Sequence, residues 1–162
     1  MPTQYQGPIR NVRALNVFIN LMRSSESLMA RLQKRLDKQG ITAGQFGVLE
    51  TLLHLGPLCH TVLGQKLLRT DGNVTMIVDN LEKRGLVRRL RTGEDRRYVS
   101  VNLTPNGKTL IEKIFPEHVA AITEEMSVLS VSEQENLRRL CRKVGKKEDV
   151  KIKMSYKKEK KE

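Results

Sequence analysis

Residues 70–104 are TDGNVTMIVDNLEKRGLVRRLRTGEDRRYVSVNLT, and this stretch decides the fold. Its first part places four branched apolar residues at i, i+3, i+4 and i+7, which predicts a helix with one buried stripe (Val74, Ile77, Val78 and Leu81). Gly85 is expected to end that helix as its C′ residue. Residues 86–91 and 98–103 are then rich in β-branched side chains and flank the turn 92–95, which predicts a hairpin with arginines at its tip. A helix followed by a basic hairpin is an arrangement suited to reading DNA.

The charge balance points to the same kind of partner. The chain of 162 residues has a net charge of +12, which favours polyanions, either nucleic acid or an anionic membrane surface. No apolar run approaches the roughly 20 residues of a spanning helix, and no signal peptide precedes the first helix, so a cytoplasmic protein is expected. Cys59 and Cys141 lie far apart and outside any metal-binding spacing, so free thiols are expected.

Upstream, residues 1–8 contain two prolines and a glycine and are expected to form a flexible arm. Residues 9–38 repeat apolar side chains in steps of three, four and seven, which predicts a long amphipathic helix. Its stripe needs a partner, either another part of the chain or a second copy. Thr42–Gln45 has the form of a capping box and opens a helix ending at Gly56. A third helix at 61–68 and the polar turn 69–73 complete a helix-turn-helix.

Downstream, Thr104 and Pro105 predict the N-cap and first residue of a helix that continues to about residue 128. Pro116 lies inside this helix and is expected to kink or interrupt it. Ser132–Glu135 is expected to be a second capping box, opening a last helix that Gly145 closes. Residues 146–162 hold eight lysines against four acids and are expected to form a disordered basic tail that could add nonspecific attraction to phosphates.

This order of elements, together with three segments, resembles the MarR family of winged-helix transcription regulators. The segments are LGQKLLRTDGNVTMIVDNLEKRGLVRR at residues 63–89, DRRYVSVNLTPNG at residues 95–107 and LSVSEQENL at residues 129–137. The resemblance covers about residues 10–145, and the second segment, with its L-T-x-x-G ending, is the most specific. It implies a mainly α fold with a small β-hairpin wing. Residues 41–103 would form the winged helix-turn-helix domain, and residues 9–40 and 104–145 would supply long dimerisation helices.

The resemblance also implies how the chain binds double-stranded DNA. A homodimer would place two reader helices about one DNA turn apart and so bind a pseudo-palindromic operator. The wing tip would reach the adjacent minor groove, where Arg97 is the expected contact and Asp95 orients it. A surface salt bridge between these two residues is the alternative. Arg96 is expected to contact phosphate or to be a solvated charge.

On the reader helix, the candidate DNA contacts are set by side-chain chemistry. Asn73 and Thr75 can hydrogen-bond base edges or phosphates, and Met76 can contact a thymine methyl group; generic polar helix surface is the alternative. Thr70 is expected to be the N-cap and could also bond a phosphate. Asp79 is expected to pair with Lys83 at i+4 rather than to read cytosine. The remaining candidates are Gly72 on the exposed face and Arg69 and Lys83 as phosphate contacts or solubilising charges.

The expected function is a sequence-specific repressor whose DNA affinity falls when a small, perhaps aromatic, effector binds. Phe18, Met22 and Phe46 are candidates to line the effector cleft, although plain core packing is the preferred interpretation of all three. No cofactor, metal site or catalytic constellation is expected, because His54, His60 and His118 lack ligand spacing and no nucleophile–base pattern occurs. A ligand-independent architectural DNA-binding protein and a protein-interaction module remain alternatives. The operator, the effector and the choice between repression and activation stay open.

Overall fold

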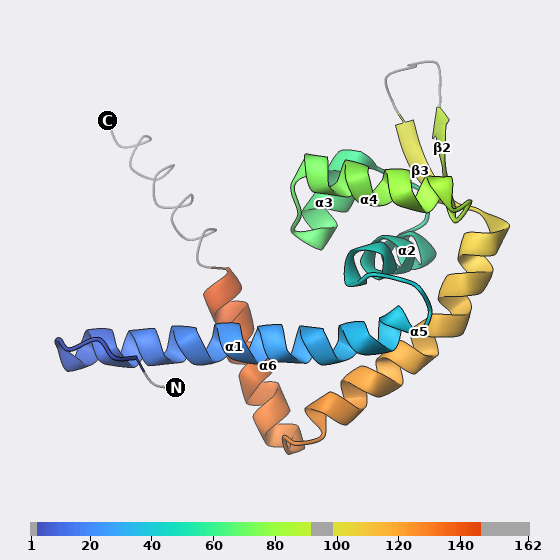
Figure 1. Cartoon of the computed structure of the whole chain (residues 1–162). Helices are drawn as coiled ribbons and strands as arrows, with labels where there is room; N and C mark the ends of the chain where they lie inside the picture. The colour runs from blue at the N-terminus through green and yellow to red at the C-terminus, as the bar shows by residue number, and fades with distance from the viewer. Residues whose placement is uncertain (1–2, 92–98, 147–162) are drawn as a thin grey trace, which may run out of the picture. The chain divides into compact units, whose positions relative to one another are not determined.

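A computed structural model describes residues 3–91 and 99–146. It is mainly helical with a small antiparallel sheet, as expected (Figure 1). Within the described ranges the elements are, in chain order, α1 (Ile9–Asp37), α2 (Ala43–Leu55), β1 (Leu58–Cys59), α3 (His60–Leu67), α4 (Asp71–Lys83), β2 (Val87–Arg91), β3 (Val99–Leu103), α5 (Pro105–Met126) and α6 (Val131–Gly145). The chain divides into two compact units after Ile122, and each is described by itself.

The core of the first unit is built around the apolar stripe of α4. Val74, Val78 and Leu81 are completely buried, and Ile77 is nearly so, which confirms the stripe expected from the sequence. They pack with buried residues of α2, α3, the sheet and α5, among them Leu49, Leu63, Val101 and Ile111. Because one side of α4 is anchored in this way, its other side is held in a fixed orientation toward solvent.

The sheet has the strand order β1-β3-β2, and both pairings are antiparallel. The β2–β3 hairpin, the expected wing, runs from the pair Val87–Leu103 at its base to the pair Arg91–Val99. The two-residue strand β1 is an addition that the sequence did not indicate, because a strand of this length shows no alternation. It pairs Leu58 with Val101 and so attaches the start of α3 to the wing.

Several helix ends confirm the expected caps. Thr42 and Gln45 form the complete capping box of α2, and Gly85 follows α4 with φ of +66°. The expected box at Ser132 is wrong: Ser130 caps α6, and its partner is Glu133. Both serines have a glutamate three residues later. The preceding turn selects Ser130, because the side-chain amide of Gln134 donates to the carbonyls of Met126 and Leu129 and closes that turn around the helix start.

Two further boundaries differ from the expectation. The turn between α3 and α4 is shorter than 69–73, because α4 begins at Asp71, so Gly72 and Asn73 lie in its first turn. Helix α5 is not interrupted at Pro116 but is continuous over 22 residues. A proline removes one donor from the ladder, and the buried residues Ile111, Ile114 and Ala121 hold the helix to the core on both sides of it.

The wing base and the start of α5 form one junction. The amide of Thr104 donates to the carbonyl of Leu86 (3.1 Å), and its hydroxyl donates to the carbonyl of Gly85 (2.7 Å). The same hydroxyl accepts from the amide of Gly107 (3.0 Å), so Thr104 is the N-cap that the sequence predicts. These bonds fix the direction in which α5 leaves the hairpin.

The long helix α1 is mostly exposed in the single chain. Only Leu32 and Leu36, near its C-terminal end, are buried, whereas Phe18 is 60% exposed. In the second unit, α6 has no buried residue, and Leu137, Leu140 and Val144 are exposed. None of the helices in residues 3–91 and 99–146 is long and apolar enough to cross a membrane.

Candidate DNA interface

Helix α4 presents most of the expected DNA contacts on its solvent face. Thr70, Gly72, Thr75 and Met76 are exposed, and Asn73 is half-buried at the edge of that face. Met76 is 57% exposed, so this long apolar side chain lies on the solvent face beside Thr75. Arg69 lies before the helix and Lys83 is its last residue, and both are exposed. The polar and apolar groups required for a major-groove contact therefore share one surface.

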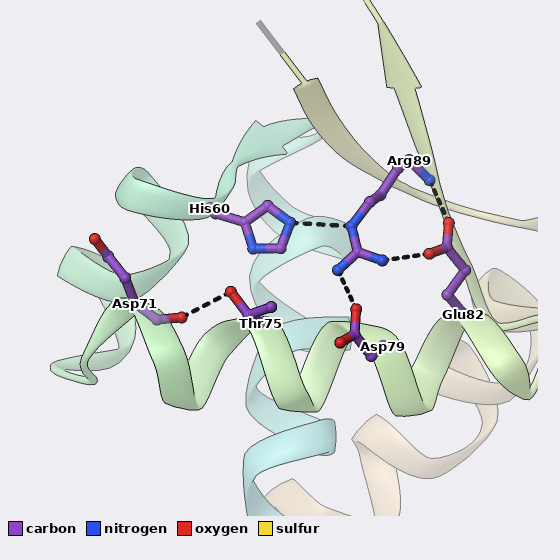
Figure 2. Close-up of polar contacts among 6 residues, drawn as sticks. All are labelled: His60, Asp71, Thr75, Asp79, Glu82 and Arg89. Atoms are coloured by element: carbon purple, nitrogen blue, oxygen red, sulfur yellow. Dashed lines mark hydrogen bonds and ion pairs between the residues drawn. The ribbon is translucent and has the colours of Figure 1, made fainter. Parts of the chain in front are cut away.

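The hydroxyl of Thr75 is already committed as a donor. It donates to the backbone carbonyl of Asp71, one turn earlier, at 2.9 Å (Figure 2). The oxygen keeps its lone pairs, so in this rotamer Thr75 can accept a hydrogen bond from an adenine or cytosine amino group but cannot donate one. The sequence pattern treats donor and acceptor roles as equal, and the structure removes one of them.

The start of α4 has a different arrangement from a standard capped helix. Thr70 is the N-cap residue by backbone geometry, but its hydroxyl makes no capping hydrogen bond. Arg69 donates to the side-chain oxygen of Asn73 at 3.4 Å, a weak bond that draws the guanidinium toward the helix N-terminus. A hydroxyl, a guanidinium and a helix N-terminus at one place form a surface suited to a phosphate oxygen.

Arg89 on β2 is the centre of a polar cluster that the sequence did not indicate (Figure 2). Its guanidinium forms ion pairs with both Asp79 and Glu82 on α4. Its Nε donates to Nε2 of His60 at 3.2 Å, and its backbone amide donates to Glu82 at 2.9 Å. The expected pair of Asp79 with Lys83 is therefore wrong: a guanidinium from β2 offers two carboxylates a fixed fork of donors, which the flexible Lys83 does not.

The cluster shifts the pKa values of His60 and Arg89. Burial lowers the pKa of His60, and the charge of Arg89 lowers it further, while nearby Asp79 and Asp71 act in the opposite direction. Burial also opposes the charge of Arg89, but its hydrogen bonds to Asp79 and Glu82 outweigh that penalty and raise its pKa. His60 is therefore neutral at pH 7, which is the state in which Nε2 can accept from Arg89.

Other basic residues near α4 have separate partners. Arg84 donates to the carbonyl of Gly40 at 2.8 Å and so ties the end of α4 to the loop before α2. Arg88 and Arg91 lie exposed on β2. The wing-tip candidates Asp95, Arg96 and Arg97 fall outside the described residues, and so does the basic tail from residue 147 onward.

The candidate effector residues do not share one environment. Phe46 is buried in the core, and its ring packs against His118 at a tilt of 45°, with the ring centroids 4.2 Å apart. Phe18 and Met22 lie exposed on α1. A pocket of about 240 Å³ lies between the end of α1 and α5, and its lining includes Arg35, Lys38 and His118. Burial lowers the pKa of His118, whose Nδ1 is buried without a hydrogen-bond partner among residues 3–91 and 99–146.

Both cysteines are free, as expected; Cys59 is half-buried and Cys141 exposed. Across the part of the chain that the structure describes, no group of three or more His, Cys, Asp or Glu side chains could hold a metal ion.

Comparison with known proteins identifies the family. The sequence profile of the MarR family matches residues 41–99, which contain the helix-turn-helix and the first part of the wing. The chain is also 36% identical over 133 residues to the HTH-type transcriptional regulator MhqR of Bacillus subtilis, covering 82% of this chain and 92% of MhqR. The chain belongs to the MarR family. This MarR-family chain is therefore a helix-turn-helix transcription regulator that binds DNA, and the family consists of regulators rather than enzymes.

Solved structures agree with the MarR fold. AbsC of Streptomyces coelicolor superposes with a TM-score of 0.78, covering 88% of this chain and 97% of AbsC; at 19% identity it shows the fold alone. BpsR of Bordetella bronchiseptica is 26% identical, with a TM-score of 0.73 over 80% of this chain and 98% of BpsR. The DNA binding of BpsR is regulated by 6-hydroxynicotinic acid.

Proposed function

We propose that this MarR-family chain is a sequence-specific repressor that binds a pseudo-palindromic operator as a homodimer and is released by a small aromatic effector. The observation that carries the proposal is the solvent face of α4. Its opposite stripe is buried, so Asn73, Thr75 and Met76 are held outward on a rigid helix, where base edges can be read. Repression rather than activation is the simplest outcome for a protein that occupies an operator.

Each site residue has a role in this proposal. Thr75 accepts from a base amino group, Asn73 bonds a base edge or phosphate, and Met76 contacts a thymine methyl group. Thr70, Arg69 and Lys83 contact phosphates, and Gly72 lets the backbone of α4 approach the DNA, since nothing lies within 4 Å of the position of its missing Cβ. At the wing tip, Arg97 enters the minor groove, Asp95 orients it and Arg96 contacts phosphate.

The homodimer is supported by the apolar surface that one chain leaves uncovered. Residues 9–40 of the first unit and α6 of the second expose aliphatic and aromatic side chains at helical spacing, including Phe18, Leu137 and Leu140. Contiguous apolar surface of this kind marks an interface. A second copy with the same stripes supplies a matching surface, and two-fold symmetry then produces a pseudo-palindromic site.

The effector is supported by the pocket beside His118 and by analogy with BpsR. Arg35 and Lys38 bring two positive charges and Glu117 one negative charge to a pocket whose other lining includes Leu36 and Ile114, a combination that suits an aromatic ring with an acidic substituent near the two basic side chains. Phe18 and Met22 extend the candidate cleft if the partner chain brings them to it, and Phe46 backs His118. Titration with 6-hydroxynicotinic acid and simple phenols, measured by calorimetry and by release of operator DNA, tests this part.

Operator binding is the central test. Affinity for the chain's own upstream region is measured against random DNA of equal length at several salt concentrations. We expect an affinity ratio above about 10³, as specific DNA-binding proteins show. A matched pair separates base readout from packing: Thr75→Ser keeps the acceptor and should bind nearly normally, whereas Thr75→Val should lose about 1–3 kcal/mol. Equal affinity for both DNAs at every salt concentration would contradict the repressor and leave an architectural role.

The architectural protein is the second candidate because of one observation, the net charge of +12. A protein that binds through phosphate contacts alone should show a steep salt dependence and no preference between DNA sequences. A protein-interaction module would instead keep its activity when Arg97 and Thr75 are both replaced by alanine.

A further inference from the structure

The Arg89 cluster joins three elements of the DNA-reading part at one guanidinium. Asp79 and Glu82 come from α4, Arg89 from the first wing strand β2, and His60 from the start of α3 (Figure 2). We propose that Arg89 is a positioning residue that fixes the wing relative to the recognition helix, so that both reach DNA at the same time. This inference rests on the proposed function, because it assigns a second determinant of the same operator affinity.

The hydrogen-bond pattern restrains the strand itself and not only a side chain. Glu82 accepts from the guanidinium of Arg89 and, at 2.9 Å, from its backbone amide. Residue 89 therefore cannot slide along α4 or rotate away from it without breaking both bonds. Arg89 is paired with Val101 of β3, so an error in its position would be passed to both strands of the hairpin.

His60, which follows the strand at the opposite edge of the sheet, accepts a hydrogen bond from the same guanidinium. In the order β1-β3-β2, Leu58 and Arg89 both lie opposite Val101, which is completely buried. Strand β1 leads directly into His60, whose Nε2 accepts from Arg89. The hydrogen bond from Arg89 to His60 thus links the two outer strands, β1 and β2, across the central strand β3. A wing held at both edges of its sheet has less freedom to swing than a hairpin attached only at its base.

The charges of Asp79 and Glu82 predict opposite changes in DNA affinity for the two possible roles of these carboxylates. The side chains of Asp79 and Glu82 are 46% and 37% exposed, so each places negative charge near the surface expected to face phosphates. If they acted only through charge, replacing either with its neutral amide would tighten DNA binding. If they hold Arg89 in place, the same replacement should weaken binding, because the wing would no longer be aligned.

The first experiment measures operator affinity of full-length Glu82→Gln and Asp79→Asn. We expect each to bind about tenfold more weakly, with lost hydroxyl-radical protection at the outer minor grooves where the wings lie. The matched control is Glu112→Gln on α5. Glu112 is a carboxylate of similar exposure, and its ion-pair partner is Lys108 on the same helix. Glu112→Gln should bind as well as the wild-type protein or slightly more tightly, with an unchanged footprint.

The second experiment separates positioning from a direct phosphate contact. Arg89→Lys keeps the charge but replaces the planar fork of donors with a compact ammonium on a flexible stem, which does not match the spacing of two carboxylates and an imidazole, so it should also bind about tenfold more weakly. Arg88→Lys makes the same change at the exposed neighbour and should leave affinity unchanged. If Arg89 acted on phosphate only as a point charge, Arg89→Lys would retain its affinity.

The outcomes distinguish this inference from the proposed function. Wild-type binding that shows no operator preference would overturn both. A wild-type preference together with normal or tighter binding by Glu82→Gln and Asp79→Asn would overturn the positioning role alone. Thermal unfolding of each variant is measured in parallel. If Glu82→Gln is unfolded at the assay temperature, Asp79→Asn decides the result, because Asp79 is the more exposed carboxylate and makes no bond to the β2 backbone.

Discussion

Leu68 has both a backbone conformation and a solvent exposure that are unusual for leucine. It ends α3 in the left-handed region with φ of +51°, and it is 93% exposed. A branched apolar side chain gains nothing from solvent, and its Cβ crowds the backbone in that conformation. The sharp turn between α3 and α4 requires the conformation, so the residue carries the strain.

Replacing Leu68 with asparagine should stabilise the fold. Asparagine tolerates the left-handed region, and no buried contact is lost, so we expect a gain of about 0.5–1 kcal/mol in the free energy of unfolding. Urea denaturation measures it. The matched control is Leu55→Asn, the same chemical change at the exposed leucine that ends α2, where no left-handed strain is relieved. An equal effect at both positions would show that strain is not the cause.

Two histidines should make stability depend on pH. Burial lowers the pKa of both His60 and His118 in the folded chain, so the unfolded chain binds more protons as pH falls. Their contribution is complete above about pH 6.5, the ordinary histidine value, and decreases below it because the unfolded chain then gains protons that the folded chain does not. The charged groups facing His60 are Arg89 and the carboxylates of Asp79, Asp71 and Glu82.

We therefore expect the melting temperature to fall between pH 6.5 and pH 5. The double variant His60→Gln, His118→Gln should show a flatter profile in this interval, because its residual carboxylates titrate at lower pH. Differential scanning calorimetry across the interval measures both profiles. A double variant with the same slope as the wild-type protein would assign the pH dependence to other groups.

At the scale of elements, the junction between wing and α5 explains one motif of the sequence. In the L-T-x-x-G segment, Thr104 bonds the carbonyl of Gly85 and caps α5, while Gly107 lies against the backbone of the wing base. A Cβ built on Gly107 would be 1.9 Å from the carbonyl oxygen of Leu86. The glycine is thus required by close approach of two backbones and not by a positive φ.

Gly107→Ala should accordingly destabilise the first unit. The added methyl group meets backbone and not a flexible side chain, so relief requires α5 to move from β2, at a cost of about 2 kcal/mol or more. Gly145→Ala is the control, because nothing lies within 4 Å of the corresponding Cβ at the end of α6. Chemical denaturation of both variants tests this, and an undiminished stability of Gly107→Ala would mean that the junction is freer than the structure shows.

At the scale of the whole molecule, the exposed apolar stripes determine what the chain can be on its own. Helix α1 buries only Leu32 and Leu36 within the chain, and α6 buries none of its residues. The proposed homodimer would cover these stripes, and folding stability would then depend on protein concentration.

Phe18→Glu should prevent assembly. A carboxylate at a 60% exposed position costs the single chain little but would be buried without a partner in the dimer interface. We expect a shift toward monomer in analytical ultracentrifugation and an operator affinity reduced at least about 100-fold, because two half-sites are no longer linked. Asn20→Glu, an equal charge change at a nearby exposed polar residue, should remain dimeric. A dimeric Phe18→Glu would place the interface elsewhere.

Features that depend on neighbours along the chain were predictable from the residues alone. The stripe of Val74, Ile77, Val78 and Leu81, the box at Thr42 and the stop at Gly85 follow from periodicity, capping and backbone freedom, all of which act within one or two turns. The three sequence segments that resemble the MarR family predicted the family and the β-hairpin wing. The DNA-contact roles of α4 and of Arg97 remain predictions from that combination.

Contacts between residues far apart in the chain became visible in the folded structure and could not be predicted from local patterns. His60 and Arg89 are 29 positions apart, and no sequence pattern around either residue predicts a contact with the other. The pairing of β1 with β3 brings them together. The choice of Ser130 over Ser132 depended likewise on bonds from Gln134 to the preceding turn. Local patterns fix which side of each helix is apolar, but the partner of a charged side chain is chosen by distance in the folded chain, and for Asp79 that partner is Arg89 and not Lys83.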